Sequence, residues 1–277
     1  MLWLQLDCLL QSAESGLEGK IKYRGNTTLD SLYMAVLDEA FGDNDQEDDS
    51  KVQSILGAVT LATNPLSPSA IALLLSLDVD DILPFLSSLH SLIIQGDKDY
   101  PVRSFHKSFH DFITNQSRCT NPRFCVYPPD QHTKLLVGCL ELMNQKLELN
   151  MCKLTDGVLN SEVKDLEERI EQHIDPALQY ACKSWHKHLV DNEPAPKLRI
   201  TPFLHQFLEN KFTFWLEVLS VLGAAREAVD ALEVVEKWVD VSNILLYLLF
   251  QILIILDSGV SYSQFNQRLH SFCSHIL

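Results

Sequence analysis

The sequence has little positive charge. Its 277 residues include 22 Lys and Arg against 37 Asp and Glu, which gives a formal net charge of −15 at pH 7. A surface that binds nucleic acid needs clustered Lys and Arg, because release of counterions from phosphates supplies much of its affinity. The composition therefore disfavours nucleic acid as a partner, although it leaves room for a local basic patch.

Long apolar runs are also missing. The strongest candidate for a membrane segment, Ile244–Leu256, spans only thirteen residues and is interrupted by Gln251. A helix needs about twenty apolar residues to cross a bilayer. We therefore predict no membrane span. The segment is better interpreted as a buried helix or a core strand, and an interfacial anchor is the alternative.

Closely paired cysteines are absent as well. Seven cysteines are spread from Cys8 to Cys273 without a Cys-x-x-Cys pair, and the closest two, Cys119 and Cys125, lie six residues apart. The first residues lack the basic region of a secretory signal and include Asp7. Free thiols in a reducing, cytoplasmic compartment are therefore predicted.

The first half of the chain contains a series of helical patterns. Apolar residues at helical spacing and cap residues predict helices over Leu29–Phe41, over Ser50–Ala62, from Ser67-Pro68 onward and from Asp78–Asp81 onward. Thr28 is the expected N-cap of the first helix. Pro84 lacks a backbone N–H, so the fourth helix is expected to begin late.

Two short apolar runs follow these helices. Leu92–Gln95 and Val102–Phe105 flank a turn rich in Gly, Asp and Pro, which is typical of a β-hairpin. Three or four helices followed by a hairpin form a winged-helix pattern. We therefore predict a winged-helix-like domain over residues 28–127, preceded in residues 1–27 by a linker or the remnant of another domain.

The second half is helical throughout. Helices are predicted over His132–Leu147, Ser161–Glu171, Pro176–Val190, Pro202–Asn210, Phe212–Leu222 and Ala224–Val239. Gly223 is the expected stop between the last two. The fold class is therefore mainly α, with a bundle or helical-repeat-like domain over residues 128–239 and a divergent apolar helical tail over residues 240–277. The expected core aromatics are Phe203, Phe207, Phe212, Phe214, Trp215 and Trp238.

Several short segments, taken in order, resemble one known family. They are Leu29–Tyr33, Ile55–Val59, Pro65–Pro68, Ser88–Ser91, His106–Ile113, Leu159–Val163, Ile174–Leu178, Tyr180–Trp185 and Phe214–Leu219. Together they are similar to the winged-helix and helical region that follows the NACHT domain of fungal NACHT-type STAND ATPases. The resemblance implies a switch held at rest by ADP and opened by exchange for ATP, associated in fungi with non-self recognition and programmed cell death.

The His106 block is similar to the Met-His-Asp element of apoptotic and plant-resistance relatives. The resemblance implies that His106 contacts the phosphate of an ADP held by an ATPase domain. Lys107 stands where the Met-His-Asp element has its aspartate. Either the contribution of the aspartate is lost in this chain, or Lys107 itself contacts a phosphate. By its place in the sequence, His106 ends the hairpin, and His110 lies on the polar side of a following helix.

The chain departs from the family in its phosphate-binding residues. A phosphate loop needs a glycine five positions before its Gly-Lys pair. The only Gly-Lys pair is Gly19–Lys20, and Glu14 occupies that position. We therefore expect no enzymatic activity and no cofactor in the isolated chain, with ADP or ATP bound only when an ATPase domain is supplied. A truncated gene model, a degenerate paralogue and a true short form are equally compatible with this departure.

Other candidate sites carry weaker signals. Leu73–Asp78 and Ile252–Asp257 are each an apolar run that ends in aspartate, as in a Walker B strand. For Leu73–Asp78, the end of one helix followed by an Asp-capped helix explains the same residues equally well. His106 and His110 have the i, i+4 spacing of metal ligands, yet Lys107 and Ser108 stand where a zinc protease needs its glutamate.

Two further features favour ordinary structural roles. His186 and His188 lie two residues apart and are expected at the surface near the C-terminal end of a helix, where cations are favoured. A DNA-reading winged helix needs a basic recognition helix, and the candidate over Asp78–His90 contains no Lys or Arg.

These observations predict a non-catalytic regulatory and interaction module. Its expected partner is a NACHT ATPase domain, in cis or in trans, with self-association as a further expectation. A stand-alone helical scaffold that binds proteins without a nucleotide link is the main alternative. A metal hydrolase that uses His106 and His110 is the alternative from the enzyme class.

Overall fold

The computed structural model describes residues 29–41, 48–155, 158–190 and 197–238. Within these ranges the chain forms eleven α-helices and a single two-stranded sheet, so the predicted mainly α class is confirmed. The predicted linker over 1–27, the Thr28 cap, the tail over 240–277 and the segments Ile244–Leu256 and Ile252–Asp257 lie outside the described residues. No helix in the described ranges is both long and apolar enough to cross a bilayer.

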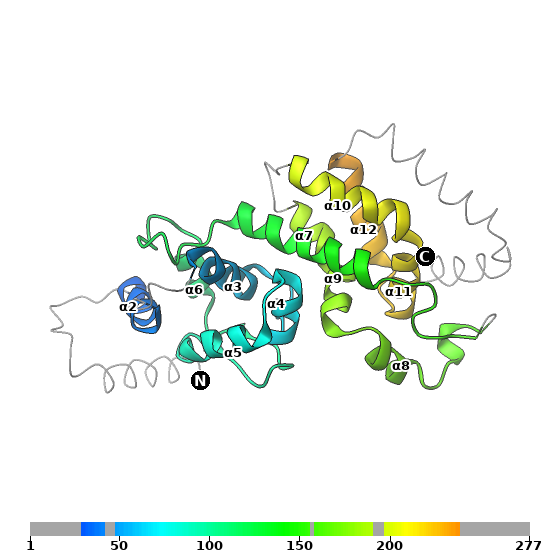
Figure 1. Ribbon diagram of the computed structural model, residues 1–277, viewed down its shortest axis with the longest axis horizontal. Helices are drawn as coiled ribbons and strands as arrows, with labels where there is room; N and C mark the ends of the chain where they lie inside the picture. The colour runs from blue at the N-terminus through cyan, green and yellow to red at the C-terminus, as the bar shows by residue number, and fades with distance from the viewer. Residues whose placement is uncertain (1–28, 42–47, 156–157, 191–196, 239–277) are drawn as a thin grey trace.

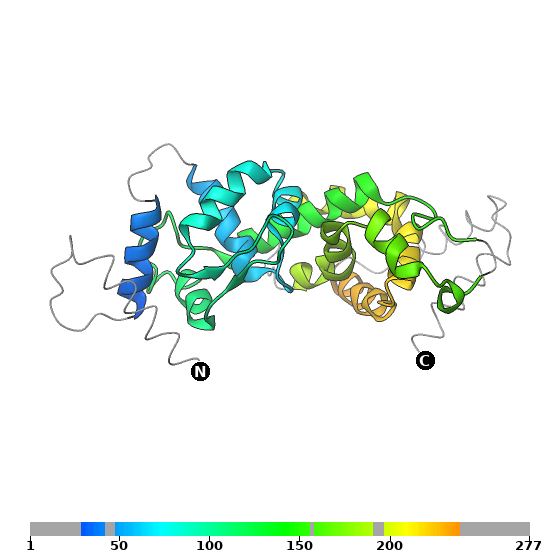
Figure 2. The same ribbon diagram turned by 90° about the horizontal axis from the view of Figure 1, so that it is seen from below.

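The elements follow one another in two groups. The first group contains α2 (Leu29–Phe41), α3 (Asp49–Leu61), α4 (Pro68–Leu75), α5 (Val79–Ser88), β1 (Ile93–Ile94), β2 (Arg103–Ser104) and α6 (Lys107–Ile113). The second contains α7 (Pro128–Lys146), the 3₁₀ turn η1 (Asn160–Glu162), α8 (Leu166–His173), α9 (Pro176–Val190), α10 (Lys197–Asn210), α11 (Phe212–Val221) and α12 (Arg226–Trp238). The two groups form two lobes of an elongated molecule, with α7 running between them (Figures 1 and 2).

Cap residues start the helices of the first lobe. The side chains of Asp48, Ser67 and Asp78 accept hydrogen bonds from backbone N–H groups at the starts of α3, α4 and α5. The predicted Ser67-Pro68 start is therefore confirmed. Leu73–Asp78 comprises the end of α4 and the cap of α5, so this segment is not a Walker B strand.

Two prolines lie inside helices that the sequence predicted to begin later. Helix α5 begins at Val79 and contains Pro84, and α10 begins at Lys197 and contains Pro202. A proline in a helix leaves the carbonyl four residues earlier without its usual partner. Both prolines are exposed, as are Asp80 and Leu198, which carry those two carbonyls. Water can therefore replace the lost bonds, and the buried faces hold both helices together.

One predicted helix is divided in the structure. Instead of a helix over Ser161–Glu171, residues Asn160–Glu162 form a 3₁₀ turn and α8 begins at Leu166. The Glu162 carboxylate accepts from the Leu159 N–H, which closes the short turn. Arg169 donates to the Asp165 carboxylate at 2.9 Å, which supports a new helical start. By contrast, Gly223 has φ +62° and separates α11 from α12 as predicted.

Helix α7 belongs to the packing of both lobes. It contacts α3 and α4 on one side and α9 and α10 on the other. Gly138 allows the close approach to α4, because a Cβ at this position would lie 2.9 Å from the carbonyl carbon of Leu74 and even closer to its oxygen. The predicted boundary between residues 127 and 128 therefore falls at the start of a helix that packs against both sides.

The predicted aromatic core is confirmed in the second lobe. Trp185, Phe207 and Trp215 are fully buried, and their ring centroids lie 5.4 to 6.0 Å apart in edge-to-face pairs. Trp215 also donates from Nε1 to the Cys182 carbonyl at 2.9 Å. Phe212 is buried, while Phe203, Phe214 and Trp238 pack against the core from half-buried positions. These contacts join α9, α10, α11 and α12.

Candidate functional site

The hairpin and α6 position His106. Strand β1 pairs antiparallel with β2, with Ile93 opposite Ser104, and the predicted hairpin is confirmed. His106 follows in extended conformation and is the N-cap of α6, where its Nδ1 accepts from the Ser108 N–H at 3.1 Å. Phe109, Phe112 and Ile113 anchor the buried face of α6. The imidazole is therefore held at a fixed place, as a helix cap next to the hairpin.

A second hydrogen bond defines the protonation pattern of this imidazole. The Ser108 hydroxyl lies 2.7 Å from His106 Nδ1, and the Tyr33 hydroxyl lies 2.7 Å from Ser108 Oγ. Because Nδ1 accepts a backbone N–H, the proton of the neutral ring belongs on Nε2. The Ser108 hydroxyl then donates to Nδ1 and accepts from Tyr33. In the described residues Nε2 has no hydrogen-bond partner, so it remains available as a donor.

Two exposed cations lie close to His106 along the chain. Arg103 at the end of the hairpin and Lys107 at the start of α6 are both exposed, and His106 itself is half-buried. The nearest acid along the chain is Asp111, which lies 3.3 Å from Nδ1 of His110. This short segment is therefore basic in a protein whose formal net charge is −15.

His106 and His110 do not form a metal site in the described residues. Across the described ranges, no three His, Cys, Asp or Glu side chains come together in a way that could hold a metal ion. The metal-hydrolase alternative therefore has no ligand set there.

Helix α2 covers α6 through one apolar stripe. Tyr33 lies 5.4 Å from both Phe109 and Phe112 between ring centroids. Phe41 stacks on Phe85 at 4.5 Å and approaches Phe124 at 6.1 Å. Burial raises the pKa of Tyr33 above its ordinary value. The Tyr33 hydroxyl is therefore protonated and able to donate at neutral pH.

A salt bridge fixes the first turn of α2. The Arg118 guanidinium donates to both carboxylate oxygens of Asp30, at 3.0 and 2.6 Å. This two-point contact lowers the pKa of Asp30 and raises the pKa of Arg118. Helix α2 is thus attached by Tyr33 to Ser108 in the first turn of α6, and by Asp30 to Arg118 in the segment after α6.

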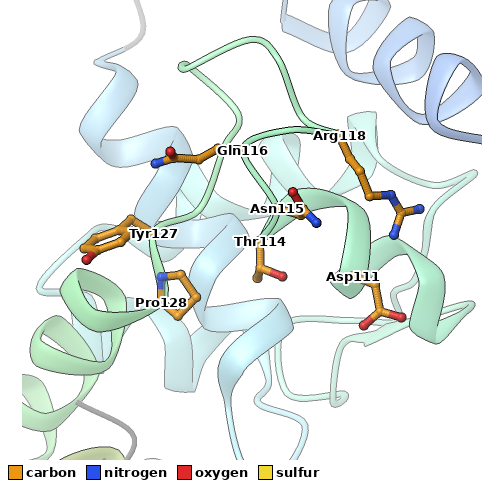
Figure 3. A pocket seen from close by; sticks show the side chains of 7 residues that line it. All are labelled: Asp111, Thr114, Asn115, Gln116, Arg118, Tyr127 and Pro128. Atoms are coloured by element: carbon orange, nitrogen blue, oxygen red, sulfur yellow. The ribbon is translucent and has the colours of Figure 1, made fainter. Parts of the chain in front are cut away.

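A shallow pocket of about 550 Å³ lies beyond the C-terminal end of α6 (Figure 3). Its lining residues are Asp111, Thr114, Asn115, Gln116, Arg118, Tyr127 and Pro128. Arg118 is the cation among them, and it is already paired with Asp30. The pocket does not include His106. No sequence pattern indicated it, because its residues come from α6, the loop that follows α6 and the start of α7.

The prediction that His186 and His188 lie at the surface is wrong. Their exposed fractions are 3% and 0%. His188 Nδ1 lies 2.9 Å from His132 Nδ1, and His188 Nε2 lies 2.7 Å from the Tyr180 hydroxyl. Burial lowers the pKa of His188 to about 3 and also lowers that of His186. Both positions face into the protein because α9 is enclosed by α4, α7, α11 and α12.

The cysteines of the described ranges are free thiols, as predicted. Cys119, Cys125, Cys139, Cys152 and Cys182 form no disulfide. Burial raises the pKa of each of these thiols, to about 12 for Cys119. A nucleophilic cysteine needs a lowered pKa. These residues therefore have the character of apolar side chains, buried in all but the half-buried Cys125.

Sequence reasoning found His106 but missed the residues that hold it. Ser108 could have been inferred, because a residue two positions after an N-cap presents its N–H to that cap. Tyr33 could not, since 75 positions separate it from Ser108 and only the packing of α2 on α6 brings them together.

The comparisons with known proteins give one relative. Over 233 residues the chain is 26% identical to vegetative incompatibility protein HET-E-1 of Podospora anserina. The match covers 76% of this chain but only 16% of the length of that protein. No family model matches the chain, and no solved structure does. The match supports a distant relationship to the fungal NACHT-related family that the sequence resembles.

Proposed function

We propose that the chain is a non-catalytic regulatory and interaction module of a NACHT-type signalling ATPase. Residues 28–127 would act as a winged-helix-like domain and residues 128–239 as a helical domain. The role is to couple the nucleotide state of the ATPase to signalling of the non-self recognition or cell-death type. The distant likeness to a vegetative incompatibility protein and the order of helices, hairpin and α6 support this proposal.

The free Nε2–H of His106 is the observation that carries the proposal. It is a fixed donor on a half-buried residue that lies, along the chain, between the exposed cations Arg103 and Lys107. A donor in basic surroundings suits an anionic acceptor such as a phosphate oxygen. Under this proposal the ATPase domain holds ADP, and the chain contributes the contact from His106 across the interface between them.

The test is binding to a recombinant fungal NACHT ATPase domain, measured by isothermal titration calorimetry with ADP and without nucleotide. His106→Asn removes the imidazole donor but keeps a side chain that can cap α6. A hydrogen bond to a charged group is worth roughly 1.5–3 kcal/mol, so this variant should bind at least about tenfold more weakly in ADP. Without nucleotide, the variant and the wild type should bind alike.

His110→Asn is the matched control, because it removes an imidazole from the same helix without touching the cap. It should bind the ADP-loaded domain as the wild type does. Equal binding by the His106→Asn chain would remove the assigned role of His106. If the wild-type chain binds neither form of the ATPase domain, the stand-alone scaffold becomes the better description.

A further inference from the structure

We infer that Ser108 and Tyr33 are positioning residues for His106, so that helix α2 sets the hydrogen-bonding state of this imidazole. The hydrogen-bond relay stands on the geometry alone. Its consequence for a partner rests on the proposed function.

The three side chains form a relay with one allowed direction. The Ser108 N–H points at His106 Nδ1 at 3.1 Å, which requires an unprotonated Nδ1. The Ser108 hydroxyl, 2.7 Å from the same nitrogen, must therefore donate its proton to it. Ser108 Oγ is then an acceptor, and the Tyr33 hydroxyl at 2.7 Å is its donor. Each proton in the relay thus has a defined place, and the remaining ring proton lies on Nε2.

The relay depends on α2 because Tyr33 is part of its buried stripe. Tyr33 has an exposed fraction of 5%, and Leu37 and Phe41 are buried one and two turns later. Its hydroxyl reaches Ser108 only while the ring packs between Phe109 and Phe112. Displacement of α2 would remove the donor to Ser108 Oγ. The Ser108 hydroxyl would then be free to rotate, and Nδ1 would keep only the longer backbone bond.

The hydrogen bonds of His106 therefore depend on whether α2 is docked. With α2 in place, the ring is held as the Nε2-protonated tautomer in a single orientation. Without it, the ring has more rotational freedom and a weaker tautomer preference. A partner that accepts from Nε2–H would bind best while α2 occupies its position on α6.

The experiment uses the full chain with ¹⁵N-labelled histidine and measures ring-nitrogen chemical shifts by NMR. His106→Asn identifies the signals of His106 by their loss. In the wild type we expect Nδ1 to show the shift of an unprotonated nitrogen and Nε2 that of a protonated one. Ser108→Ala should move the two shifts toward each other, Ser108→Thr should restore them, and Tyr33→Phe should produce a smaller change in the same direction.

Tyr100→Phe is the control for Tyr33→Phe, because Tyr100 is 52% exposed and lies outside the relay. It should leave the His106 signals unchanged. Thermal unfolding of each variant checks that the chain is folded. Wild-type shifts of His106 in both the Ser108→Ala and the Tyr33→Phe chains would overturn the inference, as would a wild-type ring protonated on Nδ1.

Calorimetry with the ADP-loaded ATPase domain separates this inference from the proposed function. If both hold, Tyr33→Phe should weaken binding by about two- to fivefold while Tyr100→Phe does not. Altered ring shifts with unchanged binding would support the relay and contradict the proposed contact. Unchanged ring shifts with weaker binding would contradict the relay, whereas weaker binding by the His106→Asn chain would still support the contact.

Discussion

Gly138 of α7 lies against the main chain of Leu74 in α4. A Cβ at residue 138 would lie 2.9 Å from the carbonyl carbon of Leu74 and 3.3 Å from its Cα, with the oxygen closer still. This crossing is one of the places where the first lobe meets α7, which also packs on α9 and α10. The absence of a single side chain therefore allows two helices to approach at backbone distance.

Gly138→Ala should destabilise the protein. Alanine is the better helix former by roughly 1 kcal/mol, but here its methyl group would displace a backbone that cannot rotate aside. We expect a net loss of about 1–3 kcal/mol in the free energy of unfolding, measured by urea denaturation. Gly57→Ala is the matched comparison. Its Cβ would meet the side chain of Gln131, which can adjust, so its loss should be smaller. Equal losses would contradict this explanation.

Stability should fall as the pH drops below about 6.5. Burial lowers the pKa of His188 to about 3, so His188 stays neutral in the fold at pH values where the unfolded chain takes up a proton. The contribution of the neutral His188 to the free energy of unfolding is fully present above the ordinary histidine pKa. It is lost between pH 6.5 and 3 at up to about 1.4 kcal/mol per pH unit for this group. His186 contributes in the same direction.

Urea denaturation between pH 4.5 and 7.5 measures this slope. His188→Gln should reduce it, because the titrating group is gone while a side chain of similar polarity remains. The control is His205→Gln, since the His205 side chain is 61% exposed. A slope that is the same in wild type and His188→Gln would show that His188 does not account for the pH dependence.

Because His106 caps α6, two substitutions at this position should reduce the stability of the protein by different amounts. Alanine cannot accept from the Ser108 N–H, so His106→Ala should cost about 1 kcal/mol of stability. Asparagine can accept from this N–H, so His106→Asn should cost only a few tenths of a kcal/mol. Thermal unfolding of the two variants measures the difference. Two equal unfolding midpoints would mean that the imidazole does not stabilise α6 as its cap.

The indole N–H of Trp215 links α11 to α9. Trp215→Phe keeps an aromatic ring in the core but removes the indole N–H that donates to the Cys182 carbonyl. We expect a loss of about 2–4 kcal/mol in urea denaturation from the smaller ring and the lost bond together. Phe214→Leu, at a half-buried position on the same helix, should cost less. The reverse order would contradict this view of the core.

The local elements were largely predictable from the sequence. Ser67 and Pro68 start a helix through their own chemistry, and Gly223 ends one because it readily adopts φ +62°. Two short apolar runs on either side of a turn rich in Gly, Asp and Pro were sufficient to identify the hairpin. One error was the helix over Ser161–Glu171, which is divided in the structure. Others came at Pro84 and Pro202, where burial of one helix face outweighed a single lost hydrogen bond on the other.

The sequence by itself determined the helical class, the hairpin and the place of His106 at the start of α6. All three follow from residues close together in the chain, through caps, turns and periodicity. Only the tertiary structure decided that Tyr33 supports His106 through Ser108, and that His186 and His188 are buried rather than exposed. The reason is physical. Which face of a helix is enclosed, and which distant side chain completes a hydrogen bond, depends on how helices pack against one another.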